Sequence, residues 1–278
     1  MPLSWGIRLP KLALRKYHNR ENQAPMTPDL LILSATEFEM ASFLAGYPNR
    51  SETTTRSGIR LISGSMGSNT FGIVITGPGV FNTAHALTAV LESPDLKLKP
   101  GLILQTGIAG VFKESGYGIG DIAVALREHY VHTGVGWEPF RNKPLPFDLS
   151  AVLPESRSGI YPMDRQSADA VYSRLNRARS GTVFKIAKGR FITVSTITAA
   201  FEAAKQIYMA YQPVMESMEG AASAHVAALY GLPMAQVRAA SNYSGERDKS
   251  NWNAGLAVER VGWACKRILT GRINEGKG

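Results

Sequence analysis

The sequence predicts a single α/β domain of three layers, in which helices cover both faces of a mixed, mostly parallel and twisted sheet. Short apolar runs of strand length alternate along the chain with segments of helical periodicity. A chain of 278 residues, of which 44% are hydrophobic and 19% charged, has enough apolar material for one large core. Strands that alternate with helices are typical of a largely parallel sheet covered on both sides.

The expected elements follow one another from residue 29 onward. Short apolar runs predict strands at residues 30–34, 72–76, 101–105, 121–125, 191–195 and 233–241. Helical periodicity predicts helices at residues 37–44, from residue 82, and at 198–211, 219–230 and 252–269, with Gly231 placed to end one of them. Residues 132–165 are rich in Gly, Pro and aromatic side chains, and we expect an irregular stretch there, a lid or a subunit contact.

Positive charge is concentrated near the N-terminus. The chain carries a net charge of +9, and residues 1–25 contain five basic residues against one acidic residue. The remainder shows no basic stripe with interleaved aromatic residues, so nucleic acid is not an expected partner. Residues 1–25 are open to three interpretations: a disordered extension, a chain that truly starts at Met26, or a targeting segment. We expect a basic disordered extension at residues 1–28, one domain at 29–272 and a flexible tail at 273–278.

Several classes of protein are disfavoured by composition. No apolar run approaches the ~18 residues that a membrane span needs, so a membrane is not an expected partner. The single cysteine, Cys265, cannot form an internal disulfide, which suits a reducing, cytoplasmic compartment. His129 and His132 lack a nearby Cys or carboxylate cluster to complete a metal site, and we expect neither a metal nor any other cofactor.

A pair of carboxylates directly follows the first expected strand. Glu37 and Glu39 lie two residues apart in the segment Ala35-Thr-Glu-Phe-Glu39. Binding sites in open α/β sheets lie beyond the carboxyl ends of the strands, so a carboxylate here is well placed to activate water. A structural role is the alternative, because acidic residues are favoured in the first turn of a helix.

Glu219 begins a helix face that is otherwise small and apolar. It follows Met218 and precedes Gly220-Ala-Ala. A carboxylate at this position can accept two hydrogen bonds from a vicinal diol such as that of ribose, and the small residues permit close approach. The alternative is again a favourable negative charge at the start of a helix.

Ser241 and Asn242 end the last expected strand. The side-chain amide of asparagine presents a carbonyl acceptor beside an N–H donor, whereas a plain Ser-Asn turn is the alternative. Another strand end, residues 195–198, places Thr196 among the expected substrate-binding residues.

The order of these motifs resembles that of the nucleoside phosphorylase and nucleosidase superfamily over nearly all of residues 29–272. The resemblance implies a nucleoside phosphorylase-like fold. It also implies that Glu39 corresponds to the water-activating glutamate of the methylthioadenosine/S-adenosylhomocysteine nucleosidases. Met218 and Glu219 correspond to the Met-Glu pair that binds ribose in this family.

Two glycine turns extend the resemblance. Residues 76–79 read Thr-Gly-Pro-Gly and residues 106–110 read Thr-Gly-Ile-Ala-Gly. The second turn lies near the nucleoside in the family, which implies that Gly107 and Ile108 contact the substrate. The segment at residues 132–140 is similar to the family region that reaches into the site of a neighbouring subunit, so we expect a homodimer or a higher homo-oligomer.

Residues 242–252 are most similar to the futalosine hydrolase branch of the superfamily. Adenine nucleosidases carry Ser-Asp where this chain has Ser241-Asn242, and they use the aspartic acid to protonate N7 and to meet the 6-amino group. A 6-oxopurine needs a donor at O6 and an acceptor for N7–H of the departing base. An amide offers both together, so Asn242, positioned by Ser241, favours a 6-oxopurine.

The choice between water and phosphate as nucleophile depends on charge. Phosphate needs cationic side chains and free backbone N–H groups. Residues 31–46 contain no Arg or Lys but do contain Glu37 and Glu39. Each carboxylate repels a dianion by about 1 kcal/mol per charge pair at 4 Å in water, and by several times more in a cleft. Water therefore suits the site better.

The resemblance and these arguments predict a purine nucleosidase, most similar to the enzymes that cleave futalosine to hypoxanthine and dehypoxanthine futalosine in menaquinone biosynthesis. Two rival enzymes remain open, a methylthioadenosine-type nucleosidase and a purine nucleoside phosphorylase. A third alternative is a nucleoside-binding protein without activity, although binding alone does not require a water-activating carboxylate.

Overall fold

The computed structural model describes residues 27–96, 98–136, 140 and 142–270. Six α-helices and ten strands form in this part of the chain, together with short 3₁₀ turns. The strands are β1 (Leu30–Ser34), β2 (Ser51–Thr54), β3 (Arg60–Met66), β4 (Asn69–Ile75), β5 (Leu102–Val111), β6 (Ile122–Tyr130), β7 (Ile160–Pro162), β8 (Ile186–Thr193), β9 (Met215–Ser217) and β10 (Met234–Tyr243). The helices are α1 (Glu37–Leu44), α2 (Val80–Leu91), α3 (Arg165–Ala178), α4 (Phe201–Tyr211), α5 (Gly220–Leu229) and α6 (Ala254–Leu269).

All the strands belong to one mixed sheet. At its centre β1 pairs in parallel with both β4 and β5, and β5 pairs in parallel with β10. Antiparallel pairing adds β3 and β2 at one edge. At the other end β10 pairs with β6 as well as with β5, so that β5, β9, β8, β6 and β10 close on themselves. The predicted mixed α/β architecture is confirmed.

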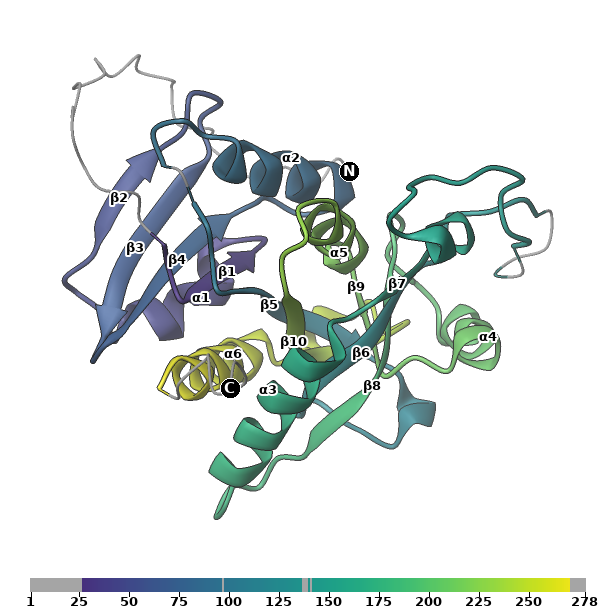
Figure 1. Cartoon of the computed structure of the whole chain (residues 1–278). Coiled ribbons are helices and arrows are strands. Elements are labelled where there is room, and N and C mark those ends of the chain that lie inside the picture. The colour runs from purple at the N-terminus through teal and green to yellow at the C-terminus, as the bar shows by residue number, and fades with distance from the viewer. Residues whose placement is uncertain (1–26, 97, 137–139, 141, 271–278) are drawn as a thin grey trace, which may run out of the picture.

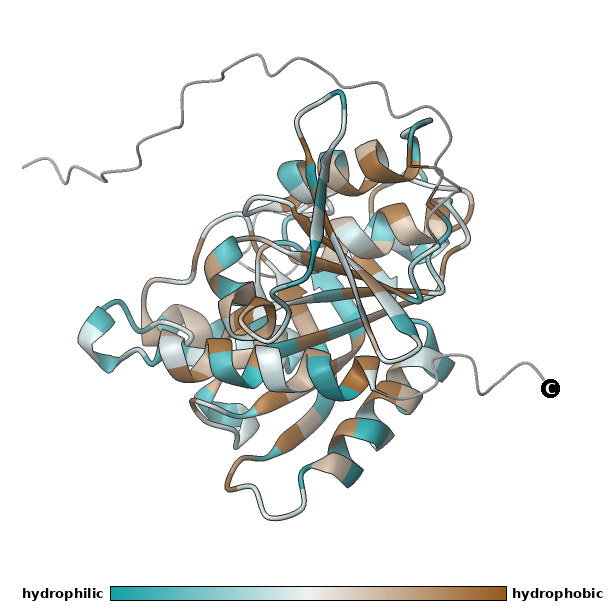
Figure 2. Ribbon diagram, turned by 90° about the vertical axis from the view of Figure 1, so that its left-hand side faces the viewer, coloured by the Kyte–Doolittle hydropathy of each residue, from teal (hydrophilic) through white to brown (hydrophobic). Residues whose placement is uncertain are grey.

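Helices cover both faces of the sheet, as Figure 1 shows. On one face α2 packs against α5, and on the other α6 packs against α1 and α3. All five residues of β1 are buried because the strand lies between the two helical layers. Figure 2 shows hydrophobic residues on the central strands and on the inner faces of the helices. This burial fixes the strand ends, and therefore the side chains that follow them, in one place.

Several boundaries differ from the sequence-based expectation. The run at residues 101–105 continues through the glycine turn as β5, and β10 continues through Asn242 to Tyr243. β8 ends at Thr193, before Ser195, and α4 begins at Phe201. Gly231 has a φ of 62° directly after α5, as expected for a residue that ends a helix. Residues 1–26 of the expected N-terminal extension (1–28) and the whole expected tail (273–278), with residues 271 and 272 of the expected domain, lie outside the described residues. Within the described ranges, no helix is long and apolar enough to cross a bilayer.

Candidate active site

Four of the expected strand ends meet at one edge of the sheet. β1, β4, β5 and β10 are neighbours that run in the same direction, so their carboxyl ends lie side by side. The chain reaches this edge again where β9 leads into α5 (Figure 1). Glu39, Glu219 and Asn242 are the candidate residues that these elements carry.

Glu39 is held rigidly at the start of α1. Thr36 is the N-cap of the helix, and it forms a capping box with Glu39, which is the third residue of the first turn. Oε2 of Glu39 accepts hydrogen bonds from the Thr36 N–H at 2.9 Å, the Thr36 hydroxyl at 3.1 Å and the Ser34 hydroxyl at 3.2 Å. Oε1 accepts the backbone N–H of Ile108 at 3.0 Å. The carboxylate is 5% exposed and has one orientation, with Oε1 turned toward β5.

Glu37 does not join Glu39. It is exposed, and it forms an ion pair with Arg60 on β3. The expectation that two carboxylates stand together after the first strand is therefore wrong for Glu37. In the first turn of a helix, side chains two residues apart point in different directions, so only one of the pair can face the sheet.

Glu219 is the N-cap residue of α5, and its carboxylate is buried. Oε1 accepts the N–H of Gly79 at 3.0 Å, which ties the first glycine turn to α5. Oε2 accepts the N–H of Met218 at 3.3 Å and pairs with the Arg238 guanidinium at 2.9 Å. Both partners of this ion pair are cut off from solvent, with side-chain exposures of 1% for Arg238 and 5% for Glu219. The carboxylate accepts three hydrogen bonds here and keeps at least one lone pair for the hydroxyls of a sugar.

Gly107 connects Glu39 to the Arg238–Glu219 pair. Its φ is 145°, and a Cβ at this position would lie 2.5 Å from Oε1 of Glu39 and 2.7 Å from Nη1 of Arg238. The Glu39 carboxylate and the Arg238 guanidinium therefore border the same small space, which only glycine leaves open. Two carboxylates around one guanidinium give this buried cluster a net charge of −1.

Sequence reasoning did not single out Arg238. It lies within β10, between Val237 and two alanines, where every neighbour is buried. A charged residue inside a strand of small and apolar residues was the available signal, since arginine is almost never fully buried without a partner. The partner, Glu219, is 19 residues away and becomes a neighbour only through the fold.

Asn242 stands at an irregularity of β10. The register with β5 shifts between Ala240 and Asn242, so that Ser241 is the extra residue and Asn242 lies opposite Gly110. The Ser241 hydroxyl donates to Oδ1 of Asn242 at 2.7 Å, and Nδ2 of Asn242 donates to the Tyr243 carbonyl at 2.9 Å. Each end of the amide keeps one further hydrogen-bonding position. Gly110 lies three residues beyond Gly107 on β5, which separates Asn242 from the acidic cluster by about 10 Å along the strand.

Three of the expected residues remain to be placed: Ile108, Met218 and Thr196. Ile108 contributes its main-chain N–H, and Met218 is half-buried next to Glu219. Thr196 is exposed between β8 and α4, and the structure records no hydrogen bond from its side chain to the described residues around it. Thr198 is the buried threonine of that segment, and its N–H and hydroxyl both donate to Glu216.

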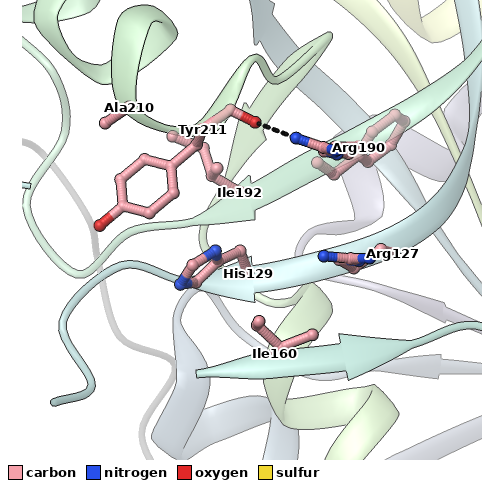
Figure 3. A pocket seen from close by; sticks show the side chains of 8 residues that line it. Arg127, His129, Ile160, Arg190, Ile192, Ala210 and Tyr211 are labelled. Carbon is pink, nitrogen blue, oxygen red and sulfur yellow. Dashed lines mark hydrogen bonds between the residues drawn. The ribbon is translucent and has the colours of Figure 1, made fainter. Parts of the chain in front are cut away.

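A cavity of about 220 Å³ lies away from these residues, between β6, β8 and the end of α4 (Figure 3). Arg127, His129, Arg190 and Tyr211 line it, and Arg190 donates to the Tyr211 carbonyl. Burial, together with the two arginines, lowers the pKa of His129 to about 4, against a raising effect of the Ser158 carbonyl. The imidazole is therefore neutral at neutral pH, and this cavity holds none of the residues expected to bind a nucleoside.

His129 and His132 do not form a metal site in the structure. His129 lies in β6 and faces the cavity, whereas Nδ1 of His132 accepts the Ser195 N–H at 3.1 Å. No group of three or more His, Cys, Asp or Glu side chains within the described ranges is arranged to hold a metal ion. The segment expected to reach a neighbouring subunit, residues 132–140, includes positions 137–139, which lie outside the described residues.

Comparisons with known proteins place the whole domain in a known family. The sequence model of the phosphorylase superfamily matches residues 29–270. A futalosine hydrolase from Streptomyces coelicolor is 28% identical over 235 residues, which cover 82% of this chain and 90% of the relative. A futalosine hydrolase from Thermus thermophilus is 28% identical over 239 residues, which cover 86% and 94%.

Solved structures share the fold. The 5′-methylthioadenosine/S-adenosylhomocysteine nucleosidase from Helicobacter pylori, with butyl-thio-DADMe-Immucillin-A, superposes with a TM-score of 0.71 at 15% identity, covering 87% of this chain and 97% of the other. The family match extends from β1 to the end of α6 and contains Glu39, Glu219, Arg238 and Asn242. The chain therefore belongs to the phosphorylase superfamily.

Proposed function

We propose that this protein is an N-glycosidase that uses water to cleave the bond between a 6-oxopurine and its ribose, with futalosine as the favoured substrate. The observation that carries the proposal is the buried cluster of Glu39, Glu219 and Arg238. It supplies a fixed carboxylate beside a sugar-binding carboxylate, and it supplies no unpaired cation for phosphate. The futalosine hydrolases that are 28% identical over most of this chain support the choice of substrate.

The charge of the cluster favours water over phosphate. Arg238 borders the same space as Glu39, and its Nη2 is already engaged by Glu219 at 2.9 Å. The net charge of −1 repels a phosphate dianion, at about 1 kcal/mol per charge pair at 4 Å in water and several times more when water is excluded. A neutral water molecule meets no such barrier.

Each residue then has a distinct part in the reaction. Glu39 takes a proton from water as the water oxygen bonds to C1′, and the C1′–N9 bond breaks with its electron pair passing to the base. The ribose becomes cationic in the transition state, so the negative charge of Glu219 beside its hydroxyls stabilises it. The base leaves with the electron pair and takes a proton at N7 from solvent water, since Asn242 can accept from N7–H but cannot supply that proton.

Asn242 suits a 6-oxopurine for a reason of hydrogen bonding. Its Oδ1 accepts from Ser241 and has one lone pair left for N7–H, while its Nδ2 donates to Tyr243 and has one hydrogen left for O6. Because both inner contacts fix the amide orientation, the same face presents a donor and an acceptor together. An adenine would put its 6-amino group against the Nδ2 donor.

The proposal has a wider setting. Hydrolysis of futalosine would give hypoxanthine and dehypoxanthine futalosine, which implies a role in menaquinone biosynthesis in the cytoplasm. We further propose that residues 29–272 form the whole catalytic unit and that residues 132–140 complete the site of a neighbouring copy in a homo-oligomer. Light scattering on the purified protein tests the last point, and a mass equal to one chain would contradict it.

One experiment separates the proposed activity from its rivals. The protein is incubated with futalosine, inosine and methylthioadenosine, each with and without phosphate, and free base is measured by chromatography. We expect hypoxanthine from futalosine at a rate that does not depend on phosphate. Phosphate-dependent release would indicate a phosphorylase, and preferential release of adenine would indicate a methylthioadenosine-type nucleosidase. Nucleoside binding without any release would indicate a binding protein.

A further inference from the structure

Glu128 is a fully buried acid that the proposed reaction does not use. It lies in β6, with 0% of its surface exposed, between two residues that face the cavity of Figure 3. Side chains alternate along a strand, so Glu128 points to the opposite face, toward α5. There its Oε1 accepts the Thr193 hydroxyl at 2.7 Å, and Thr193 in turn accepts the N–H of Ala221 at 2.9 Å. The acid thus contacts the first turn of the helix that Glu219 caps.

Gly220 makes room for this acid. A Cβ at Gly220 would overlap both Oε2 of Glu128 and Oε1 of Gln236. Neither oxygen has a hydrogen-bond partner among the described residues. Nε2 of Gln236 is without a partner in the described part of the chain as well. A fully buried carboxyl with one oxygen unbonded is more stable neutral than charged, and a proton on Oε2 of Glu128 gives Oε1 of Gln236 a donor. The geometry therefore favours a neutral carboxyl that accepts from Thr193 and donates to Gln236.

Burial favours the neutral state of Glu128 against most of the groups around it. Arg238 from β10 attracts a negative charge on it, and Glu219 repels one, while Thr193 and Gln236 are neutral. On the same face, Tyr161 of β7 and His225 of α5 pack edge to face, and burial raises the pKa of the tyrosine and lowers that of the histidine, so both are neutral. Burial raises the pKa of Glu128 to about 8, against the lowering effects of Thr193, Arg238 and Gln236.

Ionisation of Glu128 would disturb the ion pair beside it. Arg238 pairs with Glu219 and also borders Glu39, so the cluster already carries one uncompensated negative charge. A third carboxylate in this region would compete for the guanidinium and would repel Glu219, and interactions of this kind are strong where water is excluded.

We propose that Glu128, as a neutral acid, is a positioning residue that reserves Arg238 for Glu219 and so keeps Glu219 oriented to bind the ribose hydroxyls. The inference rests on the proposed function, because it assigns the ribose contact to Glu219. The inference also gives Gly220 a role, because only glycine at this position leaves space for the Glu128 carboxyl next to Glu219.

The decisive variant is Glu128→Gln. Glutamine can accept from Thr193 and donate to Gln236, as the neutral acid does, but it cannot ionise. We expect its kcat and KM for futalosine at pH 7 to lie within about twofold of the wild-type values. For the wild type, kcat/KM should fall about tenfold per pH unit above pH 8, mainly through KM. The fall should disappear in Glu128→Gln.

Two further variants complete the experiment. Glu128→Leu removes the acceptor of the Thr193 hydroxyl and the acid beside the Gln236 amide. We expect KM to rise at least tenfold while kcat changes less, with the fold checked by circular dichroism. Glu216→Gln removes another buried carboxyl, one whose pKa burial also raises but which contacts Thr198 instead of Arg238. This control should keep the alkaline fall of the wild type.

The outcomes are distinguishable. If Glu128→Gln shows the same alkaline fall as the wild type, or if Glu128→Leu keeps the wild-type KM, Glu128 does not position Glu219 and the inference is overturned alone. If the wild type cleaves no nucleoside at pH 7, the proposed function fails and the inference fails with it.

Discussion

Buried charge is the feature that most constrains the individual residues of this site. A guanidinium that is 1% exposed is costly unless a partner and hydrogen bonds compensate, and Arg238 meets that need through Glu219. Glu39 meets the same need through four donors from Ser34, Thr36 and Ile108. These hydrogen bonds hold each carboxylate in a single orientation before substrate binds. Preorganised sites stabilise a transition state in this way.

Replacing Glu39 with glutamine should remove turnover without removing the fold. Glutamine also serves at the third position of a capping box, so α1 keeps its N-terminus. An amide cannot take the proton of water, and loss of a general base typically lowers kcat by about 10²–10⁴-fold. The measurement is kcat with futalosine beside a thermal melt. Glu37→Gln is the matched control, since Glu37 is exposed and should keep near wild-type turnover. Turnover by Glu39→Gln at the wild-type rate would remove Glu39 from the mechanism.

Replacing Asn242 with aspartate should shift preference from 6-oxopurines toward 6-aminopurines. One carboxylate oxygen would still accept from Ser241, but the other would face the Tyr243 carbonyl and O6 of the base with no hydrogen between them. A buried acceptor left unpaired costs roughly 1–3 kcal/mol, and more when it is charged. We expect kcat/KM for futalosine to fall at least about tenfold, with partial gain of adenine-nucleoside cleavage. Futalosine cleavage at the parent rate would show that Asn242 does not read the base.

Among the elements, β5 shows how a strand can carry a site within its length. Gly107 has a φ of 145°, and because it has no side chain it leaves a space between Glu39 and Arg238.

Gly107→Ala should therefore lower kcat/KM by about 10²-fold or more, because a Cβ displaces both charged groups and small misplacements at a reacting centre are costly. The fold should survive with a lower melting temperature.

Gly255→Ala is the matched control for Gly107→Ala. Gly255 lies in the first turn of α6, where nothing approaches an added Cβ within 4 Å. Alanine is favoured over glycine in helices by about 1 kcal/mol, so this variant should keep full activity and melt slightly higher. Equal activity of the two variants would show that the space at Gly107 is not used.

Sequence patterns predicted the elements with longer apolar runs and missed those that are short or rich in polar residues. β1 was predicted because its residues are apolar or small, and α1 because residues 37–44 show helical periodicity. β2 was missed because its four residues are polar and fully exposed, so it is defined by pairing with β3 alone. α3 was missed although Asp164 caps it, because only a few of its residues are buried in a polar sequence.

The same distinction holds for the site. Glu39, Glu219 and Asn242 could be found because each lies at the end of a strand or just after it, where chemistry collects in such sheets. Arg238 and Glu128 lie inside strands, and their meaning depends on partners that are distant in sequence. The irregularity at Ser241, which turns Asn242 to lie opposite Gly110, leaves no mark in the residue pattern. Local sequence patterns therefore identify polar residues at the ends of strands. Contacts between buried residues that are distant in sequence can be seen only in the folded structure.

For the molecule as a whole, two buried groups make stability depend on pH in opposite directions. The pKa of Glu128 is raised from 4.5 to about 8, so between these values the folded state holds a proton that the unfolded state has lost. Stability from this group is present below pH 4.5 and is lost as pH rises to about 8. The pKa of His129 is lowered from 6.5 to about 4, so between those values the unfolded state holds the extra proton and stability rises with pH.

The two effects cancel between about pH 4.5 and 6.5, and above pH 6.5 the effect of Glu128 remains alone of the two. Its slope is about −1.4 kcal/mol of unfolding free energy per pH unit, one proton's worth. Urea unfolding of the wild type and of Glu128→Gln between pH 6.5 and 8 measures it, with no substrate present. We expect the slope of the wild type to exceed that of Glu128→Gln by about this amount, while His129→Gln keeps the wild-type slope in this range. Parallel slopes for wild type and Glu128→Gln would mean that Glu128 is already ionised in the folded protein at pH 6.5. Arg238 would then lie among three carboxylates, Glu39, Glu128 and Glu219, throughout the neutral range.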